Sequence, residues 1–97
     1  MNLVRIVVHF EFADRIESIL DEFGIEQYVR ISGVESKDAD GKHFGTKVYP
    51  GMAILMEALV EDSGLPDLLH ALKEFKEERP VHRHIQIQVL RIEQVVK

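Results

Sequence analysis

One stretch decides how the rest of this chain is organised: residues 33–51, which read GVESKDADGKHFGTKVYPG. Glycine at positions 33, 41, 45 and 51, the proline at 50 and the polar run 35–42 argue against one long strand or helix. Apolar, strand-like sequence lies on both sides, at 27–32 and 52–60. We therefore predict a long connection between two paired strands. Hairpin loops usually have about two to five residues, so a loop of this length is either functional or disordered.

Outward from this stretch, apolar spacing predicts the remaining elements. They are strands at 3–12, 25–32, 52–60 and 84–95, and helices at 14–23 and 63–78. We expect Asp14 and Ser63 to cap the two helices, and Gly24 to follow the end of the first. The order is β-α-β-β-α-β, which predicts an α+β, ferredoxin-like sandwich: a four-stranded antiparallel sheet in the order 4-1-3-2 with two helices on one face. The domain prediction is one unit, residues 1–97, with a long loop at about 33–51.

Alternation along the predicted strands separates two faces of the sheet. The first strand should turn an apolar set toward the helices, consisting of Val4, Ile6, Val8, Phe10 and Phe12. The other face should carry a second apolar set, consisting of Leu3, Val7, Leu90, Ile92 and one face of the third strand. A contiguous apolar sheet face is typical of an interface.

Composition excludes several classes of function. The chain of 97 residues has no cysteine, which excludes disulfides, thiolate metal sites and cysteine nucleophiles. A net charge of −5 argues against non-specific nucleic-acid binding. No segment has the length of a membrane span, and the first residues do not resemble a signal peptide. No pairing of a nucleophile with a base is visible. We therefore predict a cytoplasmic protein that is not an enzyme, with no nucleic-acid partner and no membrane insertion.

The sequence resembles the P-II nitrogen-regulatory superfamily of trimeric signalling proteins. The match rests on the order of elements, the length and the long loop, and above all on the segment His43-Phe44-Gly45-Thr46-Lys47-Val48-Tyr49-Pro50-Gly51. That segment is similar to the pattern His-x-Gly-Thr-x-Val-aromatic-Pro-Gly of small P-II-like proteins. The resemblance implies a homotrimer, a small effector in the clefts between subunits and a regulated protein partner at the long loop. It also implies ligand-binding roles for Gly33, His43, Gly45 and Thr46.

The chain departs from that superfamily at two points. Nucleotide-binding P-II proteins hold phosphates on a glycine-rich loop before the last strand, whereas residues 79–84 here read RPVHRH. The long loop also lacks the glutamine that the archetypes use for 2-oxoglutarate. Both departures argue against sensing of ATP and 2-oxoglutarate and favour a smaller anion or nucleotide.

Residues 79–84 nevertheless contain candidate ligand-binding side chains. Arg79 and Arg83 could bind an anion, because guanidinium groups suit phosphate or carboxylate, or they could complement the end of the preceding helix. In the predicted topology His9, His43, His82 and His84 approach one end of the sheet, which would suit a divalent metal. The alternative is that two surface histidines happen to lie near the start of a strand.

Three function classes follow from these patterns. The first is a P-II-like trimeric regulator that binds an effector between subunits and a protein through its loop. The second is a metal-binding or metal-tolerance module similar to the CutA-type proteins. The third is an ACT-like amino-acid sensor, which shares the same order of elements and would be a dimer.

Overall fold

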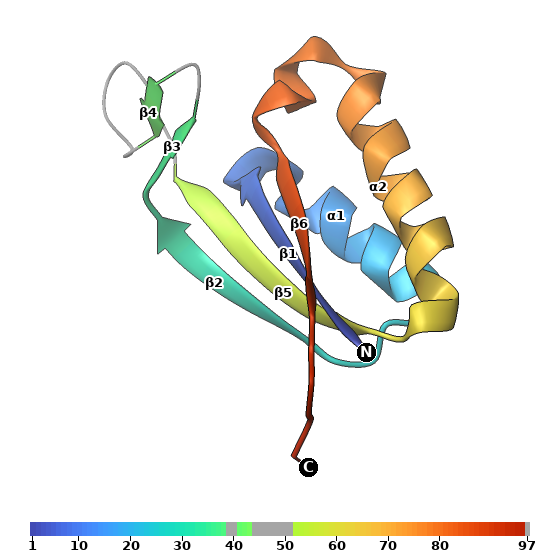
Figure 1. Cartoon of the computed structure of the whole chain (residues 1–97). Coiled ribbons are helices and arrows are strands. Elements are labelled where there is room, and N and C mark those ends of the chain that lie inside the picture. The colour runs from blue at the N-terminus through green and yellow to red at the C-terminus, as the bar shows by residue number, and fades with distance from the viewer. Residues whose placement is uncertain (39–40, 44–51, 97) are drawn as a thin grey trace.

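The computed structural model describes residues 1–38, 41–43 and 52–96, which form one sheet layer and one helix layer (Figure 1). The elements are β1 (Asn2–His9), α1 (Phe10–Glu22), β2 (Tyr28–Val34), β3 (Ser36–Asp38), β4 (Gly41–His43), β5 (Ala53–Val60), the 3₁₀ helix η1 (Asp62–Gly64), α2 (Leu65–Glu78), the 3₁₀ helix η2 (Pro80–His84) and β6 (Gln86–Arg91). The main sheet has four antiparallel strands in the order β2-β5-β1-β6. Both long helices cover one face of it (Figure 1). The predicted α+β ferredoxin-like fold and strand order are confirmed.

Strand β1 lies in the interior of the sheet, paired with β5 on one side and with β6 on the other. Val4, Ile6 and Val8 are fully buried under the helices, as their alternation predicts. The prediction that Phe10 and Phe12 continue this strand is wrong, because β1 ends at His9. Both phenylalanines belong to the first turns of α1, and Phe10 is half exposed.

Helix α1 begins earlier than its polar residues suggest. His9, not Asp14, is the N-cap: its Nδ1 accepts a hydrogen bond from the backbone N–H of Glu11 at 3.3 Å. Ala13, Ile16 and Leu20 lie on its buried face. Gly24 follows the C-cap with φ 69°, a conformation that glycine adopts without cost. The predicted role of Gly24 is confirmed, and that of Asp14 is not.

The long connection contains more regular structure than we predict from its polar sequence. Strands β3 and β4 form a small antiparallel hairpin in which Lys37 pairs with Lys42. The pairing of β2 with β5 shifts register between Ile31 and Val34, where Gly33 has φ 70°. A bulge there bends the end of β2 and feeds the chain into the hairpin. Residues 39–40 and 44–51, which include Gly45 and Thr46, lie outside the described part.

Helix α2 completes the helical layer. Its buried residues Leu68, Leu72 and Phe75 pack on the sheet and on α1. The predicted cap Ser63 lies in η1 instead, and Gly64 is the N-cap without a side-chain hydrogen bond. The last strand is also shorter than the predicted 84–95: His84 belongs to η2, and β6 ends at Arg91. No helix in the described part of the chain is long and apolar enough to cross a membrane.

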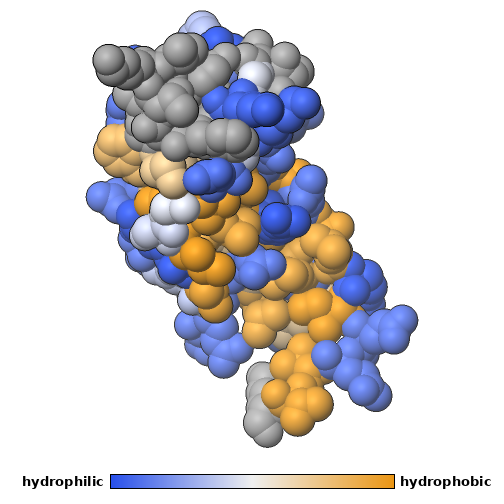
Figure 2. All heavy atoms as spheres, turned by 90° about the vertical axis from the view of Figure 1, so that its left-hand side faces the viewer, coloured by the Kyte–Doolittle hydropathy of each residue, from blue (hydrophilic) through white to orange (hydrophobic). Residues whose placement is uncertain are grey.

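The helices leave the opposite sheet face uncovered, and we call it the open face. Register places seven apolar side chains on it: Leu3, Val7, Val29, Ile31, Leu55, Leu59 and Leu90. Val29, Ile31 and Leu90 are exposed at 56%, 44% and 49%. Figure 2 shows apolar atoms gathered across this side of the molecule. The prediction of an apolar second face is confirmed for Leu3, Val7, Leu90 and the strand β5, whereas Ile92 lies beyond the end of β6. Arg5, Glu57, Gln86 and Gln88 share this face.

Candidate anion-binding site

The site is built on the side of α2 that turns away from the core. Leu69, Lys73, Lys76 and Glu77 recur at a spacing that keeps them on one face of a helix. Helix α2 ends at Glu78, and the extended backbone of its C-cap Arg79 directs the chain into η2. Proline at position 80 cannot continue the helical hydrogen bonds, so the chain turns at that point. Side chains from α2 and η2 therefore lie next to the start of β6.

These side chains line a surface pocket of about 700 Å³, which we call the cationic pocket. Its lining residues are Leu69, Lys73, Lys76, Glu77, Arg79, Pro80, Arg83 and Ile87. Four cationic side chains and one carboxylate give the lining a formal charge of +3, whereas the whole chain carries −5. A positive pocket on an acidic protein attracts anions, because nearby charges act more strongly than distant, screened ones.

Element η2 is fixed by a histidine that packs in the core. His82 is only 3% exposed, and its ring stacks on Phe75 at 4.2 Å and meets the ring edge of Phe12 at 4.7 Å. Its Nδ1 lies 2.7 Å from the carbonyl oxygen of Phe75. A carbonyl only accepts hydrogen bonds, so Nδ1 carries the proton. This arrangement attaches η2, with Arg79 and Arg83 on either side of His82, to the last turns of α2.

The predicted metal site is not formed by the histidines whose side chains are described. His82 lies in the core, and His84 ends η2 rather than sharing a strand face with it. His9 caps α1. Among the side chains that the structure describes, those of residues 1–37, 41–42 and 52–96, no group of three His, Cys, Asp or Glu residues is placed to hold a metal ion. His43 ends β4, and its side chain lies outside the described part.

Of the predicted anion-binding residues, the two arginines line the cationic pocket and Gly33 does not. Arg79 and Arg83 both line the cationic pocket, and Arg83 also donates a hydrogen bond to the carbonyl oxygen of Pro80 at 3.3 Å. Gly33 lies in the bulge of β2 and does not line this pocket. The sequence analysis missed Lys73 and Lys76, because a charged run at the end of a helix usually indicates a solvated surface. The spacing of both lysines from Leu69, which places all three on one helix face, was the signal in the sequence that could have identified them.

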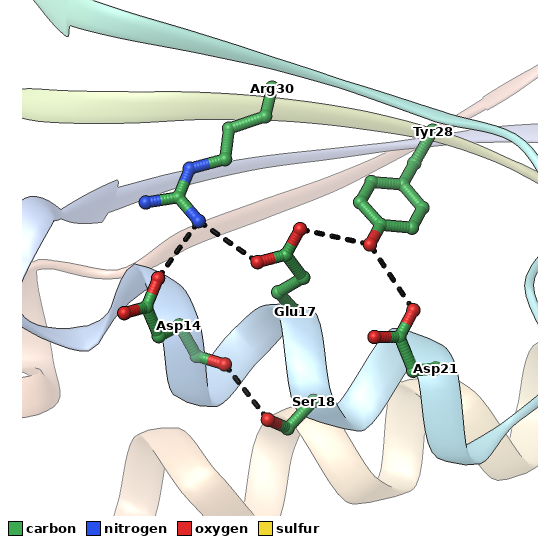
Figure 3. A network of polar contacts seen from close by, with 6 residues as sticks. All are labelled: Asp14, Glu17, Ser18, Asp21, Tyr28 and Arg30. Carbon is green, nitrogen blue, oxygen red and sulfur yellow. Dashed lines mark hydrogen bonds and ion pairs between the residues drawn. The ribbon is translucent and has the colours of Figure 1, made fainter.

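A second polar cluster joins β2 to α1 (Figure 3). Arg30 binds Asp14 at 2.9 Å and Glu17 at 3.0 Å, and the hydroxyl of Tyr28 lies 2.9 Å from Glu17 and 3.2 Å from Asp21. The hydrogen bond to Glu17, with desolvation and the Asp21 carboxylate, raises the pKa of Tyr28 to about 12. All of these contacts run between β2 and α1. We therefore assign the cluster a structural role, holding the outer strand of the sheet against the helix.

Comparison with solved structures identifies the architecture. CPII, a nitrogen regulatory PII-like protein from Thiomonas intermedia K12 described as bound to ADP, AMP and bicarbonate, superposes with a TM-score of 0.74. The match covers 91% of this chain and 86% of that one at 17% identity. This chain has the PII-like fold.

A second PII-like structure agrees. A candidate PII-like signalling protein from Thermus thermophilus gives a TM-score of 0.64 at 20% identity, covering 92% of this chain and 82% of the other. The ligand-free form of CPII gives 0.67 at 15% identity, covering 94% and 89%. No protein-family profile matches the sequence, and no curated protein matches it. The PII-like fold thus rests on structure, and the sequence resemblance to that superfamily agrees with it.

Proposed function

We propose that this protein is a PII-like regulator, not an enzyme, that binds a small anionic effector in the cationic pocket. The observation that carries the proposal is the +3 charge of this lining on a chain of net charge −5. The fold supports it, since CPII is described as bound to ADP, AMP and bicarbonate. Guanidinium groups such as those of Arg79 and Arg83 suit both phosphate and carboxylate oxygens.

The loop chemistry favours small anions over long polyphosphates. Residues 79–84 contain no glycine, so backbone N–H groups are not free to wrap a triphosphate as a glycine-rich turn would. Side-chain cations alone should bind one or two anionic groups. We therefore expect AMP, ADP or bicarbonate to bind more tightly than ATP.

Isothermal titration calorimetry tests this proposal. AMP, ADP, bicarbonate and ATP are titrated into the wild type and into an Arg79→Ala, Arg83→Ala variant. Binding of at least one small anion, weakened about tenfold or more in the variant, supports the proposal, because each charge-assisted contact contributes about 1.5–3 kcal/mol. Glu78→Gln serves as the control on the same helix end. Absence of binding by all four anions, or equal binding by the variant, refutes it.

We further propose that the protein is a homotrimer whose three open faces pack together. Seven apolar side chains on that face support this assembly, since they lie on both sides of a row that contains Glu57, Arg5 and Gln88, and large exposed apolar groups are typical of an interface. Gly33, His43, Gly45 and Thr46 would then contribute to the effector site from the long loop.

In this proposal the long connection contacts a regulated protein. The hairpin of β3 and β4 extends from the body of the molecule beside the ends of β2 and β5 (Figure 1). Replacing residues 35–42 with a Gly-Ser linker, which keeps His43, should leave anion binding and trimer mass unchanged. If the variant loses anion binding as well, residues 35–42 belong to the effector site rather than to a separate partner surface.

A further inference from the structure

We propose that Glu77 makes the cationic pocket select anions that also carry hydroxyl or amino hydrogen-bond donors. This inference rests on the proposed function, because it assumes that the pocket binds an anion. Glu77 is the one carboxylate in the described lining of the pocket, among Lys73, Lys76, Arg79 and Arg83. A pocket built only to hold a bare anion would gain nothing from a negative charge in its wall.

The position of Glu77 follows from the helix. It lies four residues after Lys73 and eight after Leu69, and this spacing keeps all three on one side of α2. Its side chain is exposed, and in the described part of the chain no ion pair joins it to the cations of the pocket. The carboxylate is therefore available to a ligand.

The chemistry of an ionised carboxylate gives this position its selectivity. The group only accepts hydrogen bonds, so it offers nothing to a phosphate oxygen and repels it. A hydroxyl or ammonium group on the same ligand would donate to it and convert the repulsion into a contact. The apolar side chains of Leu69, Pro80 and Ile87 offer a surface for the carbon skeleton that joins the two groups.

Two phosphate monoesters of equal charge test the idea. Methyl phosphate has no alcohol hydroxyl, whereas glycerol 3-phosphate has two. Both are titrated at pH 7.5 into the full-length wild type, and the dissociation constants are measured from ¹H–¹⁵N chemical-shift changes. We expect wild type to bind glycerol 3-phosphate about threefold to tenfold more tightly than methyl phosphate, which is the range of one ordinary hydrogen bond in a solvent-exposed pocket.

The variants separate selectivity from overall charge. Glu77→Gln should bind methyl phosphate about threefold more tightly, as expected for removing one charge about 6 Å from the ligand in water. Its preference for glycerol 3-phosphate should fall toward one. Glu77→Asp keeps the carboxylate and should keep the preference. Glu78→Gln, which changes charge beside the pocket, should leave the ratio of the two dissociation constants unchanged.

Two results would overturn the inference, and they are distinguishable. If Glu77→Gln strengthens both esters equally, the carboxylate acts only as a repelling charge, and the proposed function survives without the selectivity. If neither ester binds the wild type, or if Arg79→Ala and Arg83→Ala change nothing, the cationic pocket is not an anion site. In that case the proposed function fails together with this inference.

Discussion

Replacing Val7 with aspartate should dissociate the proposed trimer while leaving the subunit folded. Val7 lies near the middle of β1 on the open face, opposite Leu55 on β5 and Gln86 on β6. Its side chain is half-buried within one subunit. An aspartate there can remain in contact with water in a separate subunit, but a trimer would enclose it among apolar side chains.

The size of the effect follows from two contributions. Fully burying a valine side chain is worth about 1.5–3 kcal/mol, so a half-buried one loses roughly 1 kcal/mol of association energy per subunit. Enclosing an unpaired carboxylate costs about 3 kcal/mol or more. The sum of about 4 kcal/mol per subunit corresponds to a roughly thousandfold weaker association for each subunit. Such a change separates the subunits at micromolar concentration.

Light scattering after size-exclusion chromatography measures this directly. The wild type should have a mass three times the 11.2 kDa of the chain, and Val7→Asp should have the mass of one chain with an unchanged far-ultraviolet circular dichroism spectrum. Val96→Asp introduces the same chemistry where the side chain is 94% exposed, and should remain trimeric. A wild-type mass of one chain, or a Val7→Asp protein that stays trimeric at nanomolar concentration, would refute the reasoning.

Three further predictions concern the subunit itself. Leu72→Ala should lower the free energy of unfolding by about 2–5 kcal/mol in urea titrations, because Leu72 is fully buried; an unchanged midpoint would contradict the assigned core. Tyr28 contributes stability that is complete below pH 10 and is lost as pH rises toward its folded pKa of about 12. Tyr28→Phe should therefore remove this loss of stability at alkaline pH. In a spectrophotometric titration, the variant should lack the tyrosine that ionises late. The Asn2 amide, with the amino group of Met1 and the guanidinium of Arg91, holds the pKa of Asp62 below its ordinary value of 3.8. The stability that Asp62 contributes is present above that pH and is lost as pH falls, so Asp62→Asn should reduce the fall in the free energy of unfolding at acid pH. A fall identical to that of the wild type would exclude this role.

The main elements could be predicted from the sequence because hydrophobic periodicity is unambiguous over most of the chain. The boundary between β1 and α1 could not. Val8, Phe10 and Phe12 continue the alternation of a strand, whereas Ala13, Ile16 and Leu20 already follow helical spacing. The residues between Val8 and Ala13 therefore fit both the strand period and the helix period. One hydrogen bond marks the start of the helix, from the Glu11 N–H to the His9 ring, while the Phe10 N–H still bonds across the sheet to the carbonyl oxygen of Met52 at 3.1 Å.

Part of the candidate site could be predicted from the sequence, because the charge of two side chains and their place between α2 and β6 were both readable. Arg79 and Arg83 are cations on a short connection, which indicated either an anion site or a contact with the end of the preceding helix, and both line the pocket. The spacing of His82 and His84 could not reveal that the chain forms a 3₁₀ helix between them, which turns His82 into the core. Hairpin pairing in the polar loop was missed because residues 36–43 lack the apolar alternation that indicates strands.

The central position of β1 has a consequence for how the chain acquires its structure. Asn2 pairs with Val60 on one side and with Arg91 on the other. The first strand can therefore complete its pairing only after β5 and β6, from later parts of the chain, have reached it. Closing such long loops loses chain entropy before any strand pairing compensates for it, which slows folding. During synthesis, Val4, Ile6 and Val8 leave the ribosome well before β5 and remain without a strand partner. In that interval β1 offers two unpaired edges to other chains, so β1 is the segment of the nascent chain that a chaperone would have to shield.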